Sequence, residues 1–372
     1  MGDTTLFHLF PPFPPTPANL FGRDSILEAL LGLGLAERSP SIILFGAGGM
    51  GKTAIALTLL HHYQIADKFG KHRHFVPCDA IENSLDGLLE RLSHAIGVHH
   101  CEDAAQLRSH LQGSPCILVL DDVDSILDPR APEAAEIATA IEEFGRCPTV
   151  CLLTTTRMDI KIQDFVRMEV PTLQVEAARD AFHSCCHLGR SVAVDDLLVE
   201  LDFHPLSITL LASAVSENNW DEPTLLEAWD NGKTSILKAS GHQSLEERIQ
   251  SILRAPTIRE LGTTVQETLE GIAAFPGDVK EIQLLNIFPQ VNRIGDAVDA
   301  LCKFSLMYRQ DGFVKIFPPF WLYFRYPTRT QLPQPGSDTS YHSASEDIQH
   351  TPQGSSLSIC FLSLQVSRLT LS

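Results

Sequence analysis

The sequence predicts an α/β domain in three layers, with a parallel sheet between two layers of helices, followed by smaller and mainly helical segments. Short apolar runs at 41–45, 116–120 and 149–154 have the pattern of strands buried on both faces. Helix-like stretches separate these runs, and strands joined by helices form parallel sheets through right-handed crossovers. After about Val170 the strand-like runs disappear, while helical spacing continues to about Tyr323.

The first half of the chain alternates between strand and helix signals. The segment 10–17 is rich in proline, which cannot donate the hydrogen bonds of a helix or sheet, and predicts a polyproline II lead-in. Asp24 is expected to cap a helix that continues to Leu31. Pro77 indicates that a strand at 74–78 lies at a sheet edge or ends there. The other helices expected here are 53–63, 85–96 and 132–144.

The second half of the chain is mainly helical. Helical spacing is found at 177–186, 195–201, 206–215 and 224–229, and more helices are expected from 244 onward. Asp311 and Gly312 separate two apolar runs, which is a strong hairpin signal. Helices followed by a terminal hairpin are typical of a winged helix. Beyond Thr328 the chain is rich in Ser, Thr, Pro and Gln, which predicts disorder.

The composition excludes several classes of protein. The 372 residues suggest two or three domains, and contents of 44% hydrophobic and 20% charged residues are typical of globular proteins. A net charge of −18 works against nucleic-acid binding, which needs clustered Lys and Arg. No apolar run approaches the roughly 20 residues of a membrane span, and the first residues lack a secretory signal. Nine cysteines, an odd number, favour reduced thiols in a cytoplasmic protein.

One loop carries a phosphate-binding motif. Residues 46–53 read GAGGMGKT and match G-x-x-x-x-G-K-[ST] between a buried strand and a helix, the context that this motif requires. Glycines let successive N–H groups surround a phosphate, and the N-terminus of the following helix adds positive charge. Lys52 is expected on the β- and γ-phosphates and the Thr53 hydroxyl on Mg²⁺. The expected nucleotide contacts in this loop are Gly46, Gly48, Gly49, Met50, Gly51, Lys52, Thr53 and Ala54.

Two further strands end in polar residues that complement this loop. Asp121 and Asp122 follow the second buried run, at the sheet edge where ligands of open α/β sheets bind. We expect Asp121 to hold Mg²⁺ through water and Asp122 to orient or deprotonate the attacking water, whereas Asp124 is expected to cap a helix. The third strand ends in three threonines and Arg157, which is either a surface residue or a sensor of the terminal phosphate. The expected catalytic residues are Lys52, Asp121, Asp122 and Arg157.

The order of these motifs resembles that of NB-ARC-type STAND NTPases, which are signal-transduction ATPases related to AAA+ proteins. The matching segments are FGRD at 21–24, GAGGMGKTAIA at 46–56, LVLDDV at 118–123, LLTTTR at 152–157 and HPLSI at 204–208. The resemblance covers roughly 18–325 and is nearest to the fungal branch, with which LLEAW at 225–229 and the Lys233-Thr234 pair also agree.

The resemblance implies a domain order and further site residues. The implied parts are a Pro-rich segment at 1–17, a P-loop NTPase domain at 18–172, a small helical domain at 173–240, a winged-helix-like domain at 241–326 and a disordered tail at 327–372. Phe21, Gly22 and Arg23 would lie over the adenine, and Pro205 would pack on the base from the helical domain. Arg157 would be the sensor, with Asp121 and Asp122 as the Walker B pair.

Two departures from the family affect the expected function. The stretch 317–323 has no basic residue where the family has a nucleotide-contacting His or Arg, and no TPR, WD40 or leucine-rich repeats follow. We expect an ATP/ADP-binding switch with slow hydrolysis, Mg²⁺ as cofactor, and protein partners or self-assembly as output. The alternatives are an active AAA+-like ATPase and a truncated, non-hydrolysing interaction protein.

Overall fold

The computed structural model describes most of the first 325 residues. They are 13–78, 84–98, 101, 103–124, 126–128, 132–157, 160, 162–232, 236–237, 253–254, 256–275, 279–304, 306–310, 312–316 and 318–325. All belong to one compact unit, Met1–Thr328. The predicted tail at 327–372, most of the Pro-rich segment, the Lys233-Thr234 pair and Asp311 lie outside the described residues. The finer domain boundaries remain predictions.

Five parallel strands form one sheet in the order β2-β3-β4-β1-β5, and the predicted parallel α/β fold is confirmed. They are β1 (Ile42–Phe45), β2 (Arg73–Pro77), β3 (Cys116–Asp121), β4 (Val150–Thr156) and β5 (Val166–Glu169). The predicted edge position of the strand that contains Pro77 is confirmed. We did not predict β5, because its four residues alternate apolar and charged side chains and form a half-buried edge rather than an apolar run.

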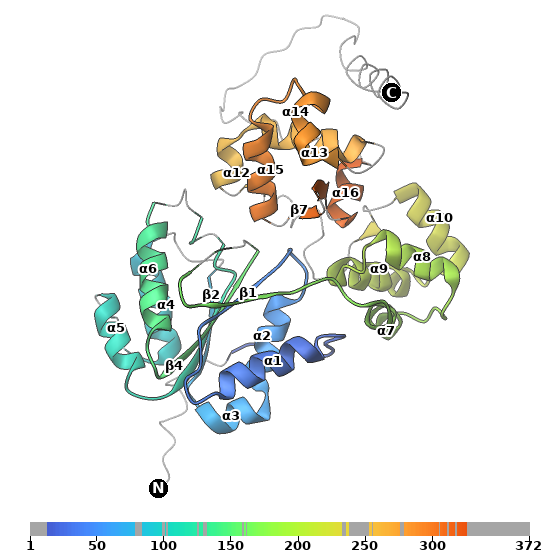
Figure 1. The fold of residues 1–372 in the computed structure, drawn as a ribbon. Helices are drawn as coiled ribbons and strands as arrows, with labels where there is room; N and C mark the ends of the chain where they lie inside the picture. The colour runs from blue at the N-terminus through green and yellow to red at the C-terminus, as the bar shows by residue number, and fades with distance from the viewer. Residues whose placement is uncertain are drawn as a thin grey trace, which may run out of the picture. The chain divides into compact units, whose positions relative to one another are not determined.

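Helices cover both faces of this sheet (Figure 1). On one face lie α1 (Asp24–Leu35), α2 (Lys52–His61) and α3 (Tyr63–Phe69), and on the other α4 (Leu85–Ile96), α5 (Ala104–Leu111) and α6 (Ala134–Gly145). Alternation along β3 supplies both cores. Ile117 and Val119 pack with the first group of helices, whereas Leu118 and Leu120 pack with the second. The central strands are therefore buried on both sides, as their apolar runs predicted.

Local signals at helix ends explain where the sequence analysis differs from the structure. The prediction that Asp24 caps α1 is wrong: Asp24 is the first helical residue, in the turn where the helix dipole favours an acid, and Arg23 precedes it. The predicted helix 53–63 is two helices, α2 and α3, separated at His62. The backbone of His62 is extended, and its Nδ1 accepts a hydrogen bond from Gln64 N at 3.4 Å. Helix α5 was not predicted.

The chain after β5 is mainly helical, as expected. Its first helices are α7 (Val175–Cys185), α8 (Val192–Glu200), α9 (Pro205–Asn218) and α10 (Glu222–Gly232). Later elements are α12 (Pro256–Glu260), α13 (Thr263–Ala274), β6 (Val279–Lys280), the 3₁₀ helix Glu281–Gln283, α14 (Leu284–Ile287), α15 (Ile294–Lys303), β7 (Met307–Gln310), β8 (Phe313–Ile316) and α16 (Pro318–Arg325). The predicted hairpin is confirmed as the antiparallel pair of β7 and β8. In the part of the chain described here, no helix has the length and apolarity to cross a membrane.

Candidate functional site

The phosphate loop, residues 46–53, joins β1 to α2 and depends on its glycines. Gly49 and Gly51 have φ angles of 83° and 90°, which residues other than glycine rarely adopt. A Cβ atom on Gly49 would lie 2.8 Å from the His204 ring and 2.8 Å from Leu206 Cβ. Close packing against residues 204–206 therefore adds a second reason for glycine at this position.

Three basic side chains from different parts of the chain bind the carbonyl oxygens of this loop. The bonds are Lys52 Nζ to Gly46 O (2.7 Å) and Ala47 O (2.9 Å), Arg23 Nη2 to Met50 O (3.1 Å) and His204 Nε2 to Gly48 O (2.8 Å). Lys52 is buried, and burial lowers its pKa to about 8, although the charge of Asp124 opposes this shift. Burial likewise lowers the pKa of Arg23 to about 10. The loop is thus held at four of its carbonyl groups.

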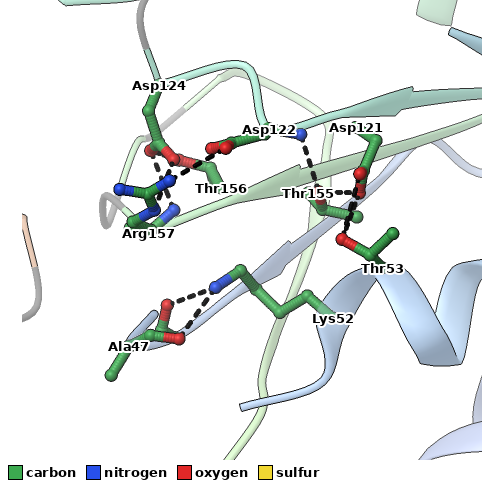
Figure 2. Close-up of polar contacts among 10 residues, drawn as sticks. Ala47, Lys52, Thr53, Asp121, Asp122, Asp124, Thr155, Thr156 and Arg157 are labelled. Atoms are coloured by element: carbon green, nitrogen blue, oxygen red, sulfur yellow. Dashed lines mark hydrogen bonds and ion pairs between the residues drawn. The ribbon is translucent and has the colours of Figure 1, made fainter. Parts of the chain in front are cut away.

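The carboxylate of Asp121 lies against the start of α2. The Thr53 hydroxyl donates to it, with 2.9 Å to each carboxylate oxygen, and the Thr155 hydroxyl lies 2.6 Å from Oδ1 (Figure 2). Burial raises the pKa of Asp121, while the bonds from the two threonines oppose this effect. A hydroxyl and a carboxylate in contact are the hard oxygen donors that Mg²⁺ prefers, so Thr53 and Asp121 fit the predicted metal.

Asp122 and Arg157 form an ion pair at the ends of β3 and β4. Arg157 Nη2 lies 2.9 Å from Asp122 Oδ2 (Figure 2). The backbone N–H of Asp122 donates to the Thr155 hydroxyl at 2.9 Å, and its φ angle of 56° lies in the left-handed region. Burial alone would raise the pKa of Asp122, but the hydrogen bond with Asp124 and the charges of Arg157 and Lys52 lower it overall.

The prediction that Asp124 caps a helix is wrong, because its carboxylate belongs to this cluster. Asp124 Oδ1 accepts hydrogen bonds from Thr156 Oγ1 at 2.7 Å and from Arg157 N at 2.8 Å, and Oδ2 lies 3.5 Å from Arg157 Nε. Burial and the neighbouring Asp122 raise its pKa to about 7. Below, "acidic edge" denotes Asp121, Asp122 and Asp124 with Thr155, Thr156 and Arg157. Asp124 is the member of this group whose role we mispredicted.

A cavity of about 550 Å³ opens above the phosphate loop, a volume in the ordinary range for small-molecule sites. It brings together most of the predicted residues: Phe21, Arg23, Gly48, Gly49, Met50, Gly51, Lys52, Thr53, Ala54, Asp122, Arg157 and Pro205. The predicted residues that do not line it are Gly22, Gly46 and Asp121. The backbone at Gly22 and Gly46 is closely packed, because a Cβ atom on Gly22 would collide with Ala177 Cβ and one on Gly46 would lie 2.8 Å from Val170 O.

About half of the residues that line the cavity were not predicted from the sequence. The additional residues are Asn19, Leu20, Thr155, Leu173, Ala181, Leu206, Thr209, Leu210, Ser213 and Phe320. Four of these recur along one face of α9 at spacings of three or four residues, a periodicity that could have indicated them. Phe320 has no such signal. It comes from the stretch 317–323, in which the family would place a basic side chain.

The comparisons with known proteins agree with this geometry at the level of the fold. Residues 42–173 match the family described as ATPases associated with various cellular activities (AAA). A Walker-type ATPase of Pyrococcus abyssi superposes with a TM-score of 0.58 at 13% identity, over 85% of this chain and 99% of that one. No curated protein matches the sequence.

Two further solved structures are similar over a comparable part of this chain. One is a STAND protein with a tetratricopeptide-repeat sensor from Pyrococcus horikoshii, at a TM-score of 0.36 and 12% identity, over 85% of this chain and 44% of that one. The other is the ORC1 protein of Aeropyrum pernix in complex with DNA, at a TM-score of 0.45 and 15% identity, over 82% and 93%. Residues 42–173 thus match the AAA ATPase family model, and the solved structure with a TM-score of 0.58 agrees with the α/β fold described above, which is that of P-loop NTPases.

Proposed function

We propose that this chain is an ATP/ADP-binding switch of the STAND type that hydrolyses ATP slowly. The observation that carries the proposal is the composition of the cavity wall. The phosphate loop, the face of α9 and Phe320 of α16 all line the same 550 Å³ space. A ligand there touches segments that are far apart in the sequence, so its phosphate state can bias how those segments are arranged.

The site residues suggest how each part of a nucleotide would be held. Amide groups of the phosphate loop and the Lys52 ammonium would bind the β- and γ-phosphates, once Lys52 exchanges its two carbonyl partners for phosphate oxygens. Thr53 and Asp121 would hold Mg²⁺, which neutralises phosphate charge during transfer. The base would lie among apolar side chains, with Phe21, Pro205 and Leu210 around it.

The ion pair of Asp122 with Arg157 is the argument for slow turnover. A general base must be free to accept a proton from water, and the Asp122 carboxylate lies 2.9 Å from a guanidinium that lowers its basicity. Arg157 must leave both Asp122 and Asp124 before it can contact a terminal phosphate. Exchange of ADP for ATP would then alter contacts with protein partners or with further copies of the chain. Nucleic acid is not proposed as a partner, because the net charge is −18.

The match of residues 42–173 to AAA ATPases favours a second candidate, a working ATPase. In that case Asp122 would be released readily, and turnover would reach tens of molecules per second, well within the usual range for enzymes. Both candidates bind nucleotide through the same loop. They differ in the rate of hydrolysis and in whether ADP is retained.

Two measurements on the purified 372-residue chain test the proposal. Mass spectrometry of the ligand released on denaturation is expected to find ADP or ATP. Turnover at saturating Mg-ATP is expected to be below about one per minute, with ADP retained, whereas tens per second would select the working ATPase. A protein that carries no nucleotide and takes up neither ADP nor ATP would contradict both candidates and leave a non-hydrolysing interaction protein.

A further inference from the structure

A fully buried histidine joins the phosphate loop to the start of α9. The Nδ1 atom of His204 accepts a hydrogen bond from Ser207 N at 3.3 Å and lies 3.0 Å from Ser207 Oγ. Its Nε2 atom lies 2.8 Å from Gly48 O, 156 residues earlier in the chain. Because Nδ1 accepts from a backbone N–H, the proton of the neutral ring is on Nε2, which therefore donates to the loop. The ring also lies edge-on to Phe320, with centroids 6.1 Å apart.

The bond to Gly48 determines how the next peptide group of the loop faces. In a planar trans peptide the carbonyl of one residue and the N–H of the next point in opposite directions. With Gly48 O turned toward His204, the N–H of Gly49 points away from His204. Gly49 has a φ angle of 83°, and the space beside its Cα is filled by His204 and Leu206. The loop thus has little freedom to turn this peptide while His204 remains bonded.

The same short segment also shapes the base side of the cavity. Pro205 and Leu206, directly after His204, line the cavity together with Thr209, Leu210 and Ser213 of α9. His204 is also the N-cap residue of α9, so its ring is bonded at both the helix start and the loop. A movement of α9 in response to the bound base would therefore stretch or break the hydrogen bond between His204 and Gly48.

We propose that His204 is a positioning residue that holds the phosphate loop in its phosphate-binding conformation and makes that conformation depend on the docking of α9. The inference rests on the proposed nucleotide function and assigns a coupling residue within it. Coupling of this kind is reciprocal: phosphates that stabilise the loop also favour the docked position of α9. Contact with Phe320 extends this coupling to α16.

Two substitutions separate the two bonds of His204. Asn resembles the Nδ1 side of the ring and is among the best N-cap residues, but it is too short to reach Gly48 O, so His204→Asn removes only the bond to the loop. Gln resembles the Nε2 side, so His204→Gln retains a donor for Gly48 and loses the cap. His62→Asn is the matched control, because His62 also caps a helix through Nδ1, at the start of α3, and does not line the cavity.

The measurement is displacement of a fluorescent ADP analogue by ADP and by adenosine, with Mg²⁺, alongside thermal unfolding. We expect His204→Asn to weaken ADP binding about 5- to 10-fold, the usual effect of one lost hydrogen bond, and to leave adenosine binding unchanged. His204→Gln should retain ADP affinity with a lower melting temperature, and His62→Asn should change neither affinity.

Each other outcome contradicts a specific statement. Unchanged ADP affinity in His204→Asn, or parallel losses of ADP and adenosine binding, would overturn the coupling while leaving nucleotide binding intact. If His204→Asn unfolds, His204→Gln decides, since an ADP loss beyond about 5-fold in that variant overturns the role of the loop bond. Failure of the wild-type chain to bind ADP or ATP would instead overturn the proposed function, and is observed before any variant is compared.

Discussion

The phosphate loop and three residues of the acidic edge, Asp122, Thr155 and Arg157, line the same cavity. The two regions are held by different kinds of bond. On the loop, Lys52, Arg23 and His204 bind backbone carbonyl groups, so the backbone itself is constrained. At the acidic edge, bonds between side chains and bonds from backbone N–H groups link the ends of β3 and β4. The loop is therefore suited to bind any phosphate in one conformation, whereas the edge can exchange partners without moving a strand.

The largest effect on ADP affinity is expected from Lys52→Ala, which removes the only charged side chain of the phosphate loop. Two charge-assisted bonds of about 1.5–3 kcal/mol each correspond to a loss of at least about 100-fold in ADP affinity. Isothermal titration with ADP and Mg²⁺ measures it. The control is Lys68→Ala, because Lys68 also binds two backbone carbonyls, Gly34 O and Ala36 O, but on the surface between α1 and α3. Equal ADP affinity in the two variants would show that the loop does not hold the phosphates.

A smaller and metal-specific effect is expected from Asp121→Asn. The amide can still accept a bond from Thr53 or Thr155, so the fold should persist, but the charge that favours Mg²⁺ is lost. Substitutions beside a bound metal typically weaken it 10- to 100-fold, and we expect ADP affinity with Mg²⁺ to fall by about this factor. With EDTA in place of Mg²⁺, variant and wild type should bind ADP alike. A loss that persists in EDTA would place Asp121 in the support of the loop instead.

The same contrast explains how much of the site the sequence could predict. The loop could be recognised from the sequence, because its glycines, Lys52 and Thr53 stand at the fixed local spacing of the phosphate-binding motif. At the acidic edge Asp121 and Asp122 were predicted from the end of an apolar strand, but Asp124 was assigned to a local cap. Its bond to Arg157 N spans 33 residues and depends on the pairing of β3 with β4, which local spacing does not reveal.

Longer-range features escaped the sequence analysis for the same reason. The motif at 204–208 was recognised, but the bond of His204 to Gly48 requires the docking of α9 on the loop. Phe320 lines the cavity and belongs to the stretch 317–323, which has no basic residue. No local sequence pattern indicates that Phe320 faces the cavity. Strand β5 was missed because an edge strand of four residues lacks a continuous apolar run. The central strands carry that run because both of their faces are covered.

Asp124→Asn tests whether the acidic edge restrains Arg157, the proposed sensor of the terminal phosphate. Asn can still accept from Thr156 and from Arg157 N, but it no longer offers a charge to the Arg157 guanidinium. Arg157 would then reach a terminal phosphate more readily, and we expect the ratio of ATP to ADP affinity to rise about 3- to 5-fold, as for part of one ion pair. Competition binding with both nucleotides measures it.

The matched control for this variant is Asp195→Asn. Asp195 forms a two-point ion pair with Arg179, with distances of 2.8 Å, between α7 and α8 and away from the cavity lining. Loss of this ion pair should leave the ratio of ATP to ADP affinity unchanged. If Asp124→Asn also leaves the ratio unchanged, or lowers it, Arg157 does not discriminate between the two nucleotides through Asp124.

No effect on ADP affinity is expected from His74→Asn. This variant tests whether a residue with a shifted pKa must belong to the nucleotide site. His74 lies on β2, buried, with Nδ1 2.9 Å from Ala95 O. Burial lowers its pKa from 6.5 to about 4, assisted by nearby His72 and opposed by the bond to Ala95. The folded chain therefore keeps His74 neutral where the unfolded chain binds a proton. The contribution of neutral His74 to the free energy of unfolding is therefore complete above about pH 6.5 and is lost as the pH falls toward 4.

Urea unfolding as a function of pH measures this contribution. At about 1.4 kcal/mol per pKa unit, the wild-type free energy of unfolding should fall by about 3 kcal/mol more than that of His74→Asn between pH 6.5 and 4. Asn keeps a donor for Ala95 O and cannot titrate, and His110→Asn on the exposed face of α5 serves as control. If the free energies of unfolding of wild type and His74→Asn changed in parallel with pH, burial would not lower the pKa of His74 as described. A change in ADP affinity would instead link β2 to the acidic edge, through the pairing of Pro77 with Asp121.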